Sequence, residues 1–169
     1  MTTAVADNET TSQTLRTGRW WLSTIRPYLN IGLWAIVVSD QPGRVPTIGV
    51  DKWWRLYYHS EWLATLTPAE VAGIWYHELC HLLNLHAARA EALQINTPEL
   101  SKVWNYATDM EINSRIAVES AEANGAFTLP AGVVRAAMIG KPDGLLAEEY
   151  YTHMLASRKA AAALAKGNG

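Results

Sequence analysis

The order of hydrophobic and polar positions predicts three short strands followed by long helices. Three β-prone runs, at 33–38, 47–50 and 54–58, are separated by turn residues. Helical patterns are expected at 16–29, from Pro68, from Pro98 to the Asn124-Gly125 pair, and at 145–165. Strands that precede several helices predict an α+β fold, in which a small and mostly antiparallel sheet packs on a central helix.

The helix expected from Pro68 has a clear start and little polar surface. Thr67 fits the N-cap, Pro68 the first helical position, and Glu70 completes a capping box. Hydrophobic residues then recur on several sides of the helix, at Val71, Ile74, Trp75, Leu79, Leu82, Leu83 and Leu85. This apolar surface is too broad for a surface helix, so we expect burial on most sides.

Three polar residues interrupt this apolar helix in the pattern H-E-x-x-H: His77, Glu78 and His81. At about 3.6 residues per turn, the two imidazoles lie one turn apart on one face, with Glu78 beside them. Zinc binds neutral imidazole, and a catalytic zinc has three protein ligands and one position for water. The motif therefore predicts a zinc hydrolase in which Glu78 is the general base. The alternative is a chance match, with both histidines hydrogen-bonded in the core.

A third zinc ligand has to come from elsewhere, and His86 is the nearest candidate. On an unbroken helix, His86 would lie about 180° around the axis from His77 and point away from the metal. A structural or hydrogen-bonding role is the alternative for His86.

The helix expected from Pro98 offers a second candidate. Asn105, Asp109 and Asn113 recur every four residues and form a polar strip on one face. Asp109 is the predicted carboxylate ligand, and Asn105 and Asn113 are predicted to hydrogen-bond behind the ligands. Exposure of this strip to solvent is the alternative. Glu111 lies off the strip and is expected to be solvated.

Catalysis also requires a donor that stabilises the negative charge of the transition state. Tyr150 and Tyr151 are candidates, as is His153, and core packing is the alternative for the tyrosines. Arg89 is either a salt-bridge partner or a group that binds substrate.

Four segments of the chain resemble a family of bacterial and phage domains named as putative metallopeptidases, which usually precede a von Willebrand factor A-like domain. The matching segments are 56–58, 77–89, 104–113 and 147–151. The resemblance implies a zincin-like fold, zinc at His77 and His81, catalytic Glu78, and a bacterial or phage origin. The sequence contains no such second domain, so a separate protein partner is expected in its place.

Composition favours one compact domain. The 169 residues, 49% of them hydrophobic, are enough for one core. We expect a disordered tail at 1–15, a single domain at 16–165 and a flexible end at 166–169. A net charge of −2 provides no basic surface for nucleic acid. No apolar run is long enough to span a membrane, the N-terminus lacks the pattern of a secretory signal, and the lone Cys80 cannot pair internally, so we expect a cytoplasmic protein.

Three interpretations follow for the whole chain. The first is a zinc metallopeptidase that holds one zinc ion and hydrolyses peptide or protein substrates. The second is a zinc-binding module that is catalytically inactive and acts through interactions with other proteins. The third is a helical structural protein in which the zinc motif is accidental.

Overall fold

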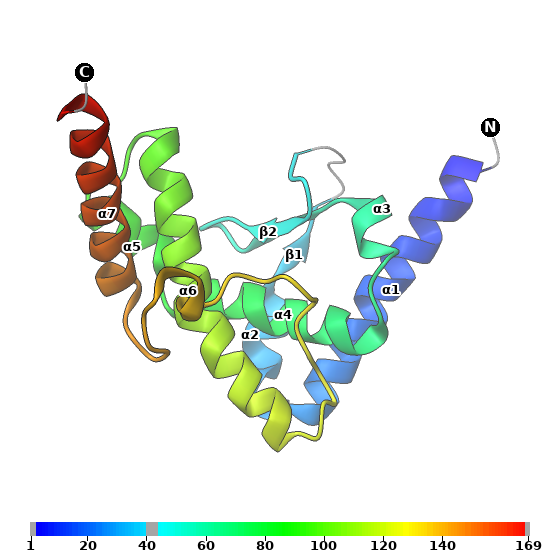
Figure 1. Cartoon of the computed structure of the whole chain (residues 1–169). Helices are drawn as coiled ribbons and strands as arrows, with labels where there is room; N and C mark the ends of the chain where they lie inside the picture. The colour runs from blue at the N-terminus through cyan, green and yellow to red at the C-terminus, as the bar shows by residue number, and fades with distance from the viewer. Residues whose placement is uncertain (1–2, 40–43, 168–169) are drawn as a thin grey trace. The chain divides into compact units, whose positions relative to one another are not determined.

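The computed structural model describes residues 3–39 and 44–167, with side chains from Gln13 to Arg158. The elements are, in order, α1 (Thr3–Ile25), the 3-10 turn η1 (Pro27–Leu29), α2 (Asn30–Ala35), β1 (Val37–Val38), β2 (Ile48–Val50), β3 (Arg55–Tyr58), α3 (Ser60–Leu63), α4 (Pro68–Leu83), α5 (His86–Ala92), α6 (Pro98–Glu122), the 3-10 turn η2 (Ala136–Ile139) and α7 (Ala147–Gly167) (Figure 1). Helices and one small sheet confirm the predicted α+β class. None of the helices in these described residues is long and apolar enough to cross a bilayer.

The chain forms two compact units. The first comprises Met1–Ala87 and Ile116–Gly132, and contains α1 to α4, the sheet and the last turns of α6. The second comprises Ala88–Arg115 and Val133–Gly169, and contains most of α5 and α6 together with η2 and α7. A single domain over 16–165 therefore stays a prediction.

The core of the first unit forms where α1 packs against α4. Leu15 of α1 is 2% exposed, and its backbone oxygen accepts a hydrogen bond of 2.9 Å from the buried indole nitrogen of Trp75. A side chain at Gly18 would collide with Val71, so the two helices approach closely here. The helix begins at Thr3, well before the predicted start at residue 16, and Leu15 in its interior belongs to the core.

The sheet of the first unit has the order β1-β3-β2. β2 pairs with β3 in antiparallel register, with Ile48 opposite Tyr58, whereas β1 runs parallel to β3, with Val37 opposite Arg55. The sheet is therefore mixed: β2 and β3 form the antiparallel pair that was expected, and β1 adds a parallel strand.

The predicted strand at 33–38 is also shorter than expected. Its first part lies in α2, where Leu33 is fully buried, and only Val37 and Val38 form a strand. At Gly32 the helix α2 lies close to α4, because a side chain there would come within 2.9 Å of Leu79. Packing of α2 against α4 thus outweighs the local preference of this run for a strand.

The helix α4 begins as predicted. The backbone nitrogen of Thr67 donates to the Glu70 carboxylate over 2.8 Å, and the Glu70 nitrogen donates to the Thr67 hydroxyl over 3.3 Å. These two bonds form the expected capping box. Residues 71–76 are all buried, which confirms the expected enclosure for this part of α4. The expectation was wrong at the end of the helix, where Leu83 is 52% exposed, and for Leu85, which lies beyond α4 and is 64% exposed.

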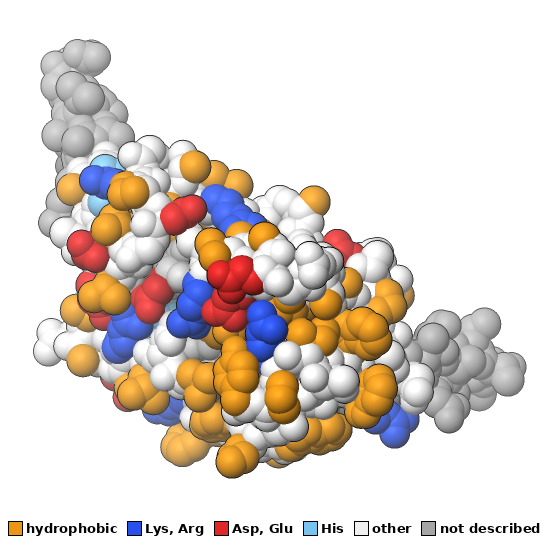
Figure 2. Space-filling view, turned by 90° about the horizontal axis from the view of Figure 1, so that it is seen from below, with side chains coloured by type: hydrophobic (Ala, Val, Ile, Leu, Met, Phe, Trp, Pro, Cys, Tyr) orange, Lys and Arg blue, Asp and Glu red, His pale blue; other side chains and the backbone are white. Residues whose placement is uncertain are grey.

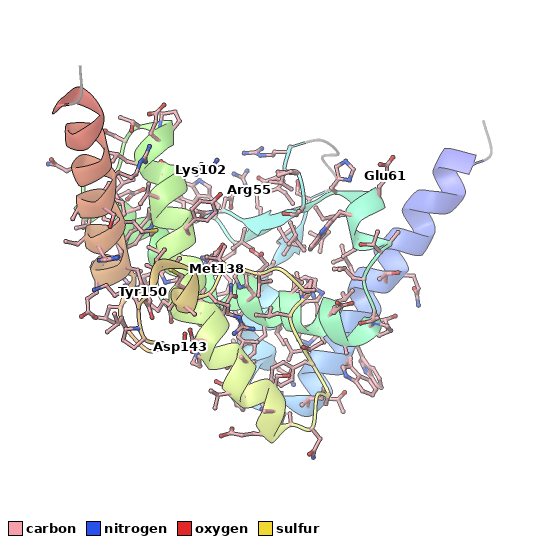
Figure 3. The ribbon with its side chains drawn as sticks, viewed as in Figure 1. Arg55, Glu61, Lys102, Met138, Asp143 and Tyr150 are labelled. Atoms are coloured by element: carbon pink, nitrogen blue, oxygen red, sulfur yellow. The ribbon has the colours of Figure 1, made fainter. Side chains whose placement is uncertain are left out.

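The second unit has its own hydrophobic core. Its buried residues come from α6, η2 and the start of α7, and are Val103, Trp104, Ala107, Met110, Ala136, Ala147, Tyr150 and Tyr151. Figure 3 shows Lys102 on α6, Met138 on η2 and Tyr150 on α7. The turns that flank these helices match the prediction, because Gly140 and Gly144 precede α7 with positive φ, and α6 ends before Asn124 and Gly125, which also have positive φ.

Candidate metal site

His77 and His81 lie one turn apart on α4, and their rings converge. The Nε2 atoms of the two imidazoles are 2.9 Å apart, and the ring planes are inclined at 72°. Both side chains are half-buried. Neutral imidazole nitrogens that point at the same place are suited to bind one divalent ion, which is the arrangement that the four-residue spacing predicts.

Glu78 follows His77 directly and lies in the enclosed part of α4. Only 4% of this residue is exposed. Burial of a carboxylate costs free energy, and the helix around Glu78 is otherwise apolar. Packing alone therefore does not account for Glu78 at this position. The combination of a buried carboxylate with two converging imidazoles is what an HExxH site requires.

His86 is closer to the motif than an unbroken helix would allow. The helix α4 ends at Leu83, and Leu85 adopts the left-handed region with a φ of 54°, so α5 starts in a new direction at His86. This break brings His86 Nδ1 within 2.9 Å of His81 Nδ1. The expectation that His86 points away was therefore wrong, because it assumed a continuous helix.

The contact between His86 and His81 fixes which nitrogen of His81 faces the site. His86 is 4% exposed and approaches His81 through Nδ1, whereas His77 approaches it through Nε2. A His81 that binds a metal through Nε2 carries its proton on Nδ1, and it then donates that proton to His86. His86 is thus placed to hold the ring and the tautomer of His81.

The polar strip of α6 is divided among three environments. Asn105 is exposed and Asp109 is half-buried. Asn113 is buried, and its side-chain nitrogen donates to the backbone oxygen of Val134 over 2.9 Å. The amide of Asn113 thus links α6 to the chain that precedes η2. Asp109 belongs to the second unit, whereas His77 and His81 belong to the first.

The sequence suggested that Glu111 is solvated. In the structure, Glu111 instead belongs to an ion cluster in the second unit. Its carboxylate accepts hydrogen bonds of 3.0 Å from Arg89 Nη2 and 2.7 Å from the backbone nitrogen of Ala147. Arg89 also donates through Nε to Glu148 over 2.8 Å. Of the two roles considered for Arg89, the salt bridge is confirmed. In the sequence, the two adjacent glutamates at 148–149, in the first turn of α7, were the available indication that a cationic side chain would pair with this part of the chain.

This cluster shifts the pKa values of its members. The hydrogen bond that Arg89 donates to Glu148, reinforced by Glu111, raises the pKa of Arg89 despite its partial burial. The same bond lowers the pKa of the Glu148 carboxyl. Arg89 and Glu148 are therefore charged at neutral pH, and the cluster ties α5, α6 and α7 together.

Tyr150 and Tyr151 are explained by packing within the second unit. The Tyr150 hydroxyl donates to the backbone oxygen of Pro142 over 2.8 Å and accepts from the Leu145 nitrogen over 3.2 Å. Burial raises the pKa of this tyrosine. Tyr151 is 8% exposed and meets Trp104 edge to face, with 5.6 Å between the ring centroids. These contacts favour the core alternative for both residues.

The fold and the converging histidines define an α+β protein of the HExxH type, a pattern typical of metal-dependent hydrolases. Residues 10–169 match a family model described as "Putative metallopeptidase domain", and the chain belongs to this family. The resemblance drawn from the sequence is thereby confirmed. No curated protein and no solved structure matches the chain.

Proposed function

We propose that the protein is a zinc-dependent metallopeptidase that holds one zinc ion and hydrolyses peptide bonds in peptide or protein substrates. The observation that carries the proposal is the 2.9 Å approach of the His77 and His81 Nε2 atoms on an enclosed helix. Membership in the metallopeptidase family supports the same reaction. The buried Glu78 between the two histidines supplies the base that such a reaction needs.

We assign the third ligand to Asp109. Two imidazoles and one carboxylate are a ligand set of catalytic zinc sites and leave one position for water. Asp109 precedes Ile116 by seven residues, about two helical turns, so both lie on nearly the same face of α6. Ile116 is fully buried in the first unit. His86 is the weaker candidate, because its Nδ1 atom is already in contact with His81.

Each residue of the site has a distinct part in the reaction. His77, His81 and Asp109 would hold the metal, which when bound would polarise the scissile carbonyl and lower the pKa of water from ~15.7 to about 7. Glu78 accepts the proton that the attacking water loses, and later returns it to the amine nitrogen of the leaving product. His86 keeps the His81 ring in one orientation, and the enclosed surroundings of α4 strengthen every charge interaction of Glu78.

Metal analysis of protein purified without chelators is the first experiment. We expect about one equivalent of zinc for the wild type, and a large loss in His77→Ala and Asp109→Ala. His153→Ala is the matched control, since it removes a histidine of the second unit that the proposal does not use. Full metal content in His77→Ala would contradict the proposed site, and full content in Asp109→Ala would contradict the third ligand alone.

The second experiment separates binding from catalysis. Glu78→Gln keeps the size of the side chain but removes its basicity, so it should retain zinc while hydrolysis of a peptide library falls by about 10²–10⁴-fold. Cleavage at the wild-type rate by Glu78→Gln would show that another group is the base. The library products of the wild type would at the same time define the preferred substrate.

A second candidate function is a zinc-binding interaction module without turnover. It is favoured by large hydrophobic side chains that are exposed on α1, η1 and α2 of the first unit, where Trp20 is 58%, Tyr28 69%, Ile31 90% and Trp34 55% exposed. Such exposure is typical of contact surfaces between proteins. Figure 2 shows many hydrophobic side chains on one face of the molecule. Wild-type protein that holds zinc yet cleaves no more peptide than Glu78→Gln would favour this module over the peptidase.

A further inference from the structure

A cavity of about 540 Å³ lies in the second unit between α6 and α7. Residues from the first half of α6, the end of η2 and positions 153–158 of α7 line it. Figure 3 shows Lys102, one of these residues, on α6. The volume is within the range of pockets that bind small molecules, about 300–1,000 Å³.

The walls of the cavity are apolar because they are the edge of a hydrophobic core. Val103 is 6% exposed and belongs to the core of the second unit, and Ile139 and Met154 pack against that core. Tyr106 contributes an aromatic ring that is 42% exposed. A ligand that fills this space would therefore bury an apolar body against a surface that is already packed from behind.

The polar residues around these walls carry an excess of positive charge. Lys102 and Arg158 are cations, whereas Glu99 is the one carboxylate among the lining residues. Within the described part of the chain, neither Lys102 nor Arg158 forms an ion pair; the Lys102 ammonium lies 6.0 Å from the ring of Tyr106. His153 adds an imidazole. Both cations are thus available to an anionic group at the edge of the pocket.

We propose that this cavity binds a small amphipathic carboxylate, a molecule with one apolar chain or ring and a single anionic head group. The apolar body would contact Val103, Ile139 and Met154, and the carboxylate would accept hydrogen bonds from Lys102 and Arg158. The size of the cavity favours a small molecule over a folded partner, and the charge selects an acid over an alcohol or an amine. None of these residues belongs to the proposed zinc ligands, so the site is tested independently of hydrolysis.

Calorimetric titration of the full chain with three ligands of equal chain length tests the charge preference. Octanoate should bind with one molecule per chain, and octan-1-ol about ten-fold more weakly, because its hydroxyl carries no negative charge to pair with the two cations. Octyltrimethylammonium should bind more weakly still, since it would face two cations. Equal affinity for the acid and the alcohol, or no octanoate binding, would overturn the proposal.

Substitutions locate the binding in this cavity. The double variant Lys102→Gln/Arg158→Gln should weaken octanoate binding by about ten-fold or more, whereas Glu99→Gln should strengthen it. Lys141→Gln is the matched control, because it removes a cation of the second unit that does not line the cavity. Ile139→Trp should fill the space and abolish binding of the alcohol as well. Unchanged octanoate affinity in the double variant would show that the acid binds elsewhere and would refute the assignment.

Discussion

The Nδ1 atom of His86 lies 2.9 Å from the Nδ1 atom of His81, across a break in the helix at Leu85. A leucine rarely adopts a positive φ, so the surrounding structure has to hold this turn in place. The result is a buried histidine behind one of the two converging imidazoles. In metal sites, a hydrogen-bonding group at this position orients the ligand and sets its basicity.

Replacement of His86 should therefore weaken metal binding without removing a ligand. We expect zinc affinity to fall by about 10–100-fold in His86→Leu, because His81 loses the acceptor for its Nδ1 proton. His86→Gln offers an oxygen acceptor and should recover part of this loss. Competition with a chelator measures both values, with His153→Leu as the control. Equal loss in the leucine and glutamine variants would indicate that His86 acts by packing alone.

Arg89 should contribute to stability through the cluster with Glu111 and Glu148. Its side chain is 24% exposed, and Arg89→Met would leave Glu111 half-buried without its cation. We expect the free energy of unfolding to fall by about 2 kcal/mol, measured by urea denaturation. Arg55→Gln breaks the exposed pair with Asp51 and should cost less. If both substitutions cost the same, the Arg89 cluster contributes no more than a surface pair.

The lowered pKa of Glu148 predicts a loss of stability in acid. The hydrogen bond from Arg89 holds the pKa of the folded carboxyl below its ordinary value of 4.5. The contribution is therefore complete at neutral pH, and it is lost as the pH falls below about 4.5 and through the folded pKa. Glu148→Gln should reduce this acid dependence in chemical denaturation from pH 7 to pH 3. Glu61→Gln is the matched control, because it removes an exposed carboxylate, labelled in Figure 3, that does not belong to the Arg89 cluster.

Gly73 should tolerate no side chain. A Cβ atom there would lie 1.8 Å from the backbone oxygen of Thr128. The backbone nitrogen of Thr128 also donates a hydrogen bond of 3.0 Å to the backbone oxygen of Ala69, so the segment around Thr128 is held against α4. Gly73→Ala has to separate α4 from this segment, and we expect a loss of about 3 kcal/mol or more in the free energy of unfolding. Gly49→Ala, where the nearest atom is 4.0 Å away, should change stability by less than about 1 kcal/mol. A folded and equally stable Gly73→Ala would contradict this packing.

Features that depend on neighbours in the chain were predictable from the sequence. The capping box of Thr67 and Glu70, the helix that follows it and the convergence of His77 with His81 all arise from residues within one or two turns. The helix α6 and its end at Asn124 and Gly125 follow from the same kind of local signal. Side chains three or four residues apart lie on the same face of a helix, and this geometry does not depend on the rest of the fold.

Tertiary structure decided the features in which distant residues meet or a local preference is overruled. The helical start of the run at 33–38 depends on Gly32 lying against Leu79, and the role of Glu111 depends on Arg89, 22 residues away. His86 was misplaced because one residue, Leu85, takes a backbone conformation that its own preference opposes. The sequence spacing determined that His77, Glu78 and His81 lie together on α4. The packing free energy of the whole chain determined where α4 ends and which side chains from other elements reach it.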